Sequence, residues 1–342
     1  SSGGVLSKRN YFALSNVQTV QSTSTASEKR INSVYGFGQI GFRNYLFLDL
    51  TARNDWSSTL PQDYFYPSFG LSAVISDMVT LPEVISFAKV RASYAQVGND
   101  TDPYNVFNTY VVNPGFGGAA SASNPSTFNN PNLKPEKTKD IELGMEMQLF
   151  NNRFGFDFSY YNRKTIDLIT PLTVSPSSGA TNLFLNAGDI ENKGIEFIVN
   201  GTPVKTDNFS WDIKVNFAQN RSEVVKLAAG TEYIPIAAVQ GGISLGATLG
   251  EPFGVIRGSD YVYVNGQPLV YTSADAPSGS WVGKYARTSS TNNVIGNINP
   301  DWTGGVKNIL KYKNFNFSFL IDIQKGGDVF SLDTWYGYAT GL

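Results

Sequence analysis

Residues 140–150 read DIELGMEMQLF, and this stretch decides the fold class. Leu143, Met145 and Met147 point to one side of an extended chain, whereas Glu142 and Glu146 point to the other. Such alternation with a period of two is typical of a strand with one apolar and one wet face. Residues 151–153 (NNR) then lead into FGFDFSYY, which alternates in the same way.

The same pattern recurs along the chain in runs near the ~9–11 residues that a tilted membrane strand needs. The runs form five pairs with short connections inside each pair and long polar connections between pairs, at 54–64, 98–137, 164–192 and 221–302. Short turns at one rim and long loops at the other are the layout of an outer-membrane β-barrel. A soluble β-sandwich, the alternative, would favour strands of about 5–6 residues without this asymmetry. The expected strands are residues 33–42, 45–53, 65–76, 87–97, 138–150, 154–163, 193–204, 209–220, 303–312 and 315–324.

The composition agrees with a barrel wall. The 342 residues are 41% hydrophobic and 13% aromatic, with a mean hydropathy of −0.17, and no apolar run is long enough for a membrane helix. Because the chain has no cysteine and no histidine, disulfides, zinc sites and histidine-based catalysis are not expected. A net charge of −2 gives no reason to expect a nucleic-acid partner.

The ends of the chain indicate an internal segment of a longer barrel. Residues 1–4 (SSGG) show no charged and apolar regions of a secretory signal. Residues 335–342 (WYGYATGL) follow a strand and look like the start of another long loop. We therefore expect all of 1–342 to be part of one transmembrane β-barrel domain.

Six motifs, in a fixed order along the chain, carry a resemblance to a known family. Residues 50–61 (LTARNDWSSTLP), 64–72 (YFYPSFGLS), 90–100 (VRASYAQVGND), 186–196 (NAGDIENKGIE) and 295–305 (IGNINPDWTGG) resemble the SusC/RagA family of TonB-dependent outer-membrane transporters of Bacteroidetes. Residues 132–138 (NLKPEKT) resemble TonB-dependent receptors in general.

The resemblance implies an antiparallel transmembrane barrel of about 22 strands around an N-terminal plug, with roughly half of the strands present here. The plug, the TonB box and the C-terminal closing strands have no counterpart in this sequence, so contact with the TonB complex would be made by a missing N-terminal part. By resemblance, the long outer loops seat a SusD-like surface lipoprotein that closes over the barrel as a lid. We expect the lid contacts to come from residues 104–112 and 233–239.

The wet face of the strands carries charges of both signs, which argues against an anion pore with a basic ring. Bonds to one another or to the plug are expected, because buried charges must be paired. Glu142 and Glu146 are taken as wall residues rather than as a catalytic pair, since they alternate along one strand. The candidate lumen-facing residues are Asp49, Arg53, Asp55, Lys89, Arg91, Glu142, Glu146, Asp157, Asp212, Lys214 and Asp322.

The expected function is TonB-dependent active import of a bulky nutrient, an oligosaccharide or a peptide, across the outer membrane. The chain would contact lipid and lipopolysaccharide, would use no cofactor and would catalyse no reaction. Two alternatives remain open. The first is a passive porin-like channel, and the second is a barrel that serves as a scaffold or docking platform in a surface or secretion complex.

Overall fold

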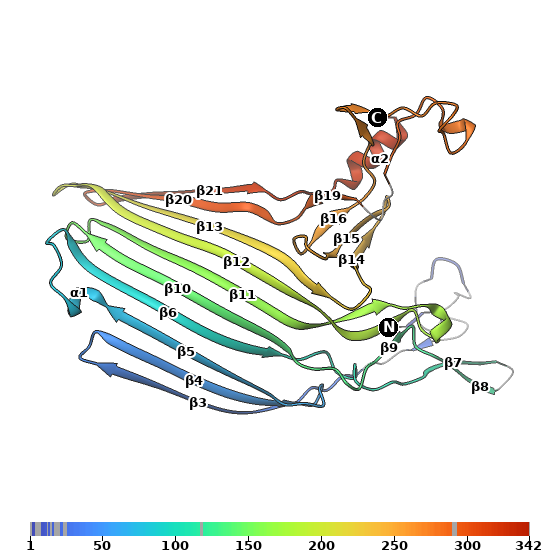
Figure 1. Cartoon of the computed structure of the whole chain (residues 1–342), viewed down its shortest axis with the longest axis horizontal. Helices are drawn as coiled ribbons and strands as arrows, with labels where there is room; N and C mark the ends of the chain where they lie inside the picture. Colours follow the sequence, from blue (N-terminus) through green and yellow to red (C-terminus); the bar gives the residue numbers. More distant parts are fainter. Residues whose placement is uncertain are drawn as a thin grey trace.

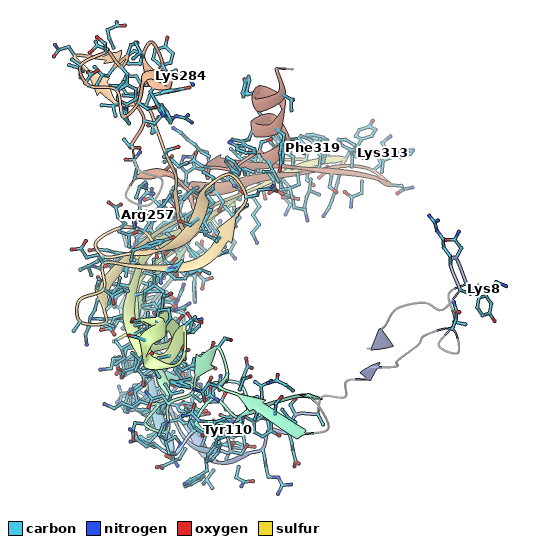
Figure 2. The ribbon with its side chains drawn as sticks, turned by 90° about the vertical axis from the view of Figure 1, so that its right-hand side faces the viewer. Lys8, Tyr110, Arg257, Lys284, Lys313 and Phe319 are labelled. Atoms are coloured by element: carbon cyan, nitrogen blue, oxygen red, sulfur yellow. The ribbon has the colours of Figure 1, made fainter. Side chains whose placement is uncertain are left out.

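The computed structural model describes residues 2–3, 8–11, 13, 16, 21–22, 26–116, 119–288 and 293–341. Its main feature is an antiparallel sheet in which ten long strands lie side by side in chain order, curled into an open trough (Figures 1 and 2). A short strand, β9 (Thr127–Phe128), adds to β12 in parallel. The long strands are β3 (Ile31–Phe42), β4 (Leu46–Ser57), β5 (Tyr64–Val74), β6 (Ile85–Asn99), β10 (Glu136–Leu149), β11 (Phe154–Thr173), β12 (Asn182–Lys205), β13 (Phe209–Leu227), β20 (Pro300–Tyr312) and β21 (Phe315–Gly326).

All ten predicted strands therefore form, in the predicted order and pairing. Within the described ranges, β3 and β21 each pair along one edge only, so the sheet is an arc of wall and not a closed barrel. The all-β, antiparallel fold class is confirmed.

Tight turns join the strands at one rim of the sheet. In the β3–β4 turn, the backbone N–H of Tyr45 donates to the Phe42 carbonyl at 3.2 Å. Arg43 and Asn44 between them have φ values of 49° and 60°, as a type I′ hairpin turn requires. We call this end, with connections 43–45, 75–84, 150–153, 206–208 and 313–314, the turn rim; the other end, with connections 58–63, 100–135, 174–181 and 228–299, is the loop rim.

The prediction of a long loop at 164–192 was wrong. β11 and β12 continue to Thr173 and from Asn182, so most of the loop expected at 164–192 is a strand pair that extends the hairpin. Regular pairing is interrupted between Thr165 and Leu168, where Asp167 has a φ of 60°. Such an irregularity shifts the alternation of faces, which is why the extension does not read as a strand in the sequence.

The asymmetry of the rims is also less strict than expected. β4 ends at Ser57 and β5 begins at Tyr64, so the connection expected at 54–64 has only six residues. At the turn rim, β5 ends at Val74 rather than Ser76, and a helical turn, α1 (Ile75–Met78), lies in a connection of ten residues. The other long connections, 100–135 and 228–299, are at the loop rim as predicted.

The loop rim has its own folded structure, which is where the side chains are buried. The largest fully buried side chains are Leu133, Val224, Val255 and Thr59, all at or near this rim. An Asn-Gly hairpin turn forms at Asn265 and Gly266, with φ values of 51° and 78°. The remaining elements are β1 (Ser2–Gly3), β2 (Gln21–Ser22), β7 (Val111–Phe116), β8 (Ala119–Ser123), η2 (Pro176–Ser178), β14 (Tyr233–Val239), β15 (Ile243–Thr248), β16 (Val255–Arg257), β17 (Tyr263–Val264), β18 (Gln267–Pro268), η3 (Gly279–Trp281), β19 (Val294–Asn297) and α2 (Leu332–Thr340).

None of the helices in the described residues is both long and apolar enough to cross a membrane.

Candidate luminal site

The register of the sheet places all eleven candidate residues on one face. Residues that lie directly opposite each other in an antiparallel pair share a face. Lys89 lies opposite Glu146, and Glu146 lies opposite Asp157. Every second residue along a strand also has the same face. Applied from strand to strand, these two rules place the candidates of β4, β13 and β21 on the face of Glu146. We call it the candidate face.

Arg91 organises the centre of the candidate face. Its guanidinium donates to Asp157 Oδ1 and Oδ2 at 2.8 and 3.1 Å and to Ser159 Oγ at 2.5 Å. Its Nε lies 3.5 Å from Glu142 Oε1. The side chain passes over Gly144, where an added Cβ would come within 2.3 Å of Arg91 Nε. The site therefore depends on a glycine at the position opposite Arg91.

A second charged group lies on β4 and β5. Arg53 Nε donates to Asp55 Oδ1 at 2.7 Å, and the same arginine donates to Ser33 Oγ at 3.0 Å. The Tyr66 hydroxyl donates to the other oxygen of Asp55. Arg53 also lies 5.9 Å from the centre of the Tyr66 ring, so a cation, an anion and an aromatic ring are held together.

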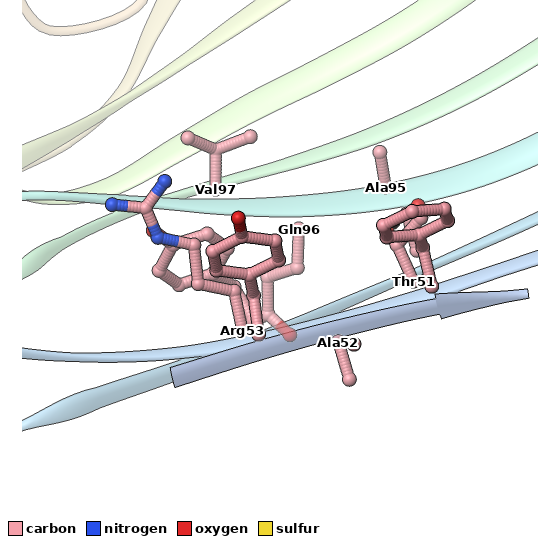
Figure 3. A pocket seen from close by; sticks show the side chains of 11 residues that line it. Thr51, Ala52, Arg53, Ala95, Gln96 and Val97 are labelled. Atoms are coloured by element: carbon pink, nitrogen blue, oxygen red, sulfur yellow. Dashed lines mark hydrogen bonds between the residues drawn. The ribbon is translucent and has the colours of Figure 1, made fainter. Parts of the chain in front are cut away.

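This charged group borders a pocket of about 500 Å³ on the candidate face (Figure 3). Tyr35 and Phe37 of β3 line it together with Thr51, Tyr66 and the small side chain Ala95. Tyr35 and Phe37 are 69% and 81% exposed. Neither ring was among the candidates predicted from the sequence, although both residues have the same parity as Ser33 and Gln39 on β3.

The other candidates are less connected. Asp49 accepts from Gln39 Nε2 at 2.7 Å, and Asp212 accepts from Thr202 Oγ1 at 2.7 Å. Within the part of the chain that the structure describes, no hydrogen bond or ion pair involves the side chains of four candidates: Lys89, Glu146, Lys214 and Asp322. Pairing among wall residues therefore accounts for some of these charges and leaves the others available.

A buried carboxylate connects the leading segment 26–30 to the loop rim. Asp100, with a side chain only 6% exposed, accepts from Lys29 Nζ at 2.5 Å, Ser57 Oγ at 2.5 Å and Thr59 Oγ1 at 3.1 Å. Burial would raise the pKa of Asp100, but these hydrogen bonds hold the pKa below its ordinary value of 3.8. Ser57, Thr59 and Asp100 all lie in motifs that carry the family resemblance.

The described residues contain no cluster of three or more acidic side chains arranged for a metal ion.

Known proteins resemble this chain over nearly its whole length. It is 29% identical over 332 residues to TonB-dependent receptor P3 of Formosa agariphila, covering 91% of this chain and 33% of that protein. TonB-dependent receptor SusC of Bacteroides thetaiotaomicron is 29% identical over 323 residues, covering 86% of this chain and 31% of SusC. The chain thus spans about a third of the length of these relatives.

Among solved structures, the RagAB peptide importer in its closed-closed state matches with a TM-score of 0.75 and 22% identity. The match covers 93% of this chain and 35% of the other, and it concerns the fold alone. Residues 4–339 match the family described as TonB dependent receptor-like, beta-barrel. The chain therefore belongs to the TonB-dependent receptor family, as its resemblance to SusC/RagA implied, and its sheet is wall of an outer-membrane β-barrel.

Proposed function

We propose that this chain is the substrate-facing wall of a TonB-dependent importer of a bulky nutrient, an oligosaccharide or a peptide. The observation that carries the proposal is the pocket of about 500 Å³ on the candidate face, where Arg53 and Asp55 border exposed aromatic rings. A solute with polar groups and an apolar face would find a partner for each in this pocket.

The candidate face has both paired and unpaired charged residues, and this arrangement suits a barrel with a removable plug. The bonds of Arg91 to Asp157 and Glu142 stay within the wall, so they persist whether or not a plug is in place. Lys89, Glu146, Lys214 and Asp322 would bond the plug when it closes the lumen. The TonB complex would then act on the plug, outside the part of the protein described here.

Exposed apolar side chains at the loop rim fit the docking of a SusD-like lid. In the segment 104–112, Phe107, Tyr110 and Val112 are 63%, 74% and 80% exposed. In the segment 233–239, the second predicted lid contact, Ile236 and Val239 are 50% and 45% exposed. A surface lipoprotein that docks on these two segments would bury these side chains.

The pocket is tested by Phe37→Ala in the intact transporter. Loss of the ring removes apolar contact with the substrate, so the half-saturation concentration for uptake should rise several-fold. Phe42→Ala is the matched control, because Phe42 is on the same strand with the opposite parity. Uptake is measured with candidate oligosaccharides and peptides as sole carbon source. Unchanged uptake by Phe37→Ala at equal barrel abundance would remove the pocket from the import path.

The sidedness of the rims is tested with single cysteines, since the chain has none of its own. A cysteine at Val112 should react with an impermeant maleimide on intact cells and lose reactivity when the lipoprotein is present. A cysteine at Lys313, on the turn rim, should react only after the outer membrane is opened. The opposite pattern would reverse the orientation and exclude lid docking at the loop rim.

A further inference from the structure

The loop rim carries a compact knob, residues 259–288, which projects beyond the ends of the long strands (Figures 1 and 2). Its core is the buried Ala286, which is 2% exposed. Backbone hydrogen bonds run from Val262 N to Ala286 O at 2.9 Å and from Ala286 N to Leu269 O at 2.8 Å. Tyr271 N also donates to Lys284 O at 2.9 Å. The knob is thus held in shape by its own backbone.

The knob contains a cavity of about 340 Å³ with aromatic and cationic walls. Tyr271 and Trp281 meet edge to face, with ring centres 6.1 Å apart and an angle of 82°. Arg287 and Lys284 lie 5.7 and 5.5 Å from the centre of the Trp281 ring. Both cations are exposed, and Lys284 lies in the projecting knob (Figure 2).

Neither of these cations is neutralised by a carboxylate in the described residues. The knob has two carboxylates of its own, and both are engaged elsewhere. Asp275 Oδ1 accepts from the backbone N–H and the hydroxyl of Thr272 at 2.5 and 2.7 Å. Asp260 Oδ1 accepts from the backbone N–H of Tyr261 at 2.7 Å. Two unneutralised cations beside one tryptophan leave a site for an anion.

We propose that this cavity is a surface-binding site for an acidic oligosaccharide, one that carries uronate or sulfate groups. The acidic group would bind Arg287 and Lys284 through charge-assisted hydrogen bonds, and the apolar face of the sugar ring would pack on the Tyr271 and Trp281 wall. The hydroxyl group of Ser259 at the cavity is suited to a sugar hydroxyl. The inference rests on the proposed import function and makes the substrate class specific. The knob would hold the chain of the polysaccharide before it enters the barrel.

The proposal is tested by calorimetric binding to the purified intact transporter, without TonB or an energised membrane. The probes are trigalacturonate, a neutral maltotriose and triglutamate. Trigalacturonate should bind, with affinity falling as salt rises, and the other two should bind at least tenfold more weakly. Because a charged hydrogen bond contributes enough to change affinity about tenfold, Arg287→Ala and Trp281→Ala should each weaken binding by at least that factor.

The matched controls are two cations at the turn rim that also lie beside an aromatic ring. Arg43 lies 5.2 Å from the centre of the Phe42 ring, and Lys313 lies 5.6 Å from the centre of the Tyr312 ring. Arg43→Ala and Lys313→Ala should leave binding unchanged. Arg287→Lys keeps the charge and the fold of the knob, and it should retain part of the affinity. The proposal is overturned if trigalacturonate does not bind, if maltotriose binds equally well, or if triglutamate binds as tightly and loses as much in Arg287→Ala. Binding without uptake in cells would refute the import function and leave the knob site standing.

Discussion

At the scale of single residues, Arg91 shows how a membrane wall can carry charge. One guanidinium serves two carboxylates, Asp157 and Glu142, and a hydroxyl, Ser159. The forked geometry of arginine suits such shared bonding, which a lysine could not reproduce. Glu146 lies directly opposite Asp157, so the removal of Arg91 would leave these two acidic groups side by side without the guanidinium that pairs with Asp157.

We therefore expect Arg91→Ala to lower the free energy of unfolding by about 1–2 kcal/mol, since Arg91 is about a third exposed and its bonds are partly screened. The control is Arg163→Ala. Arg163 pairs with Asp140 at 2.7 Å but is 53% exposed, and its loss should cost about 0–1 kcal/mol. The measurement is the temperature at which the intact transporter loses its heat-modifiable band. Equal shifts for the two variants would contradict a special role of Arg91.

The buried Asp100 should make the attachment of the leading segment 26–30 to the loop rim depend on pH. Its folded pKa is depressed, so its bonds to Lys29, Ser57 and Thr59 stabilise the fold above the ordinary value of 3.8 and are lost as pH falls below it. A spin label on a cysteine at Ser27 should be restricted at neutral pH and become mobile in acid. In Asp100→Asn the label should be mobile at both pH values. Glu28→Gln is the control, because Glu28 is 76% exposed; mobility equal in the two variants would refute the assignment.

At the scale of elements, the strict alternation of β10 made its register predictable, since a slip by one residue would exchange its two faces. The extensions of β11, β12 and β13 were not predictable in this way. Val224 of β13 packs against Ile234 and Ala247 of the β14–β15 hairpin, so these strand ends are stabilised by distant loop residues. Tyr35 and Phe37 of the candidate face were predictable from parity, but charge alone does not point to them.

The outer face of β10 is tested by Met145→Arg. A mid-strand arginine that faces lipid should cost about 2–4 kcal/mol. Gln148→Arg is the control on the same strand, because Gln148 has the parity of the candidate face and lies over Gly155, where an added Cβ would come within 2.2 Å of its Oε1. Urea titration of the intact transporter in lipid vesicles measures both. If Gln148→Arg lowered the free energy of unfolding more than Met145→Arg did, the assignment of the two faces would have to be reversed.

The loop rim is tested by Leu133→Ala. Leu133 is fully buried and packs with Leu60 and Val106, so its truncation should cost about 2–5 kcal/mol. Because this cluster lies at the loop rim and meets the wall only at Ile169 and Phe184, on the extensions of β11 and β12, the damage should be local to this rim. We expect faster proteolysis within 100–135 on intact cells and an unchanged heat-modifiable band. Val112→Ala, at a side chain that is 80% exposed, is the control; equal proteolysis of both variants would contradict the prediction.

At the scale of the whole molecule, the two edges of the sheet are its least satisfied part. β3 and β21 are each 12 residues long, and within the described ranges each has one neighbour. Every second residue of such a strand directs its backbone N–H and C=O groups away from the neighbour. In hydrocarbon each unpaired group costs several kcal/mol, so the arc needs further strands to span a membrane.

We therefore expect the 342-residue chain, expressed alone with an export signal, to fail to form a stable inserted barrel. The open edges would instead pair with other copies, because an unpaired edge is a template for further strands. The measurement is heat-modifiable migration of the membrane fraction, with the intact transporter in the same preparation as the control. Coexpression of the rest of the barrel as a second chain should restore the band, since it would supply neighbours for β3 and β21. A heat-modifiable band from the chain alone would show that ten strands can close on themselves, and the assignment of this sheet to a larger barrel would then have to be withdrawn.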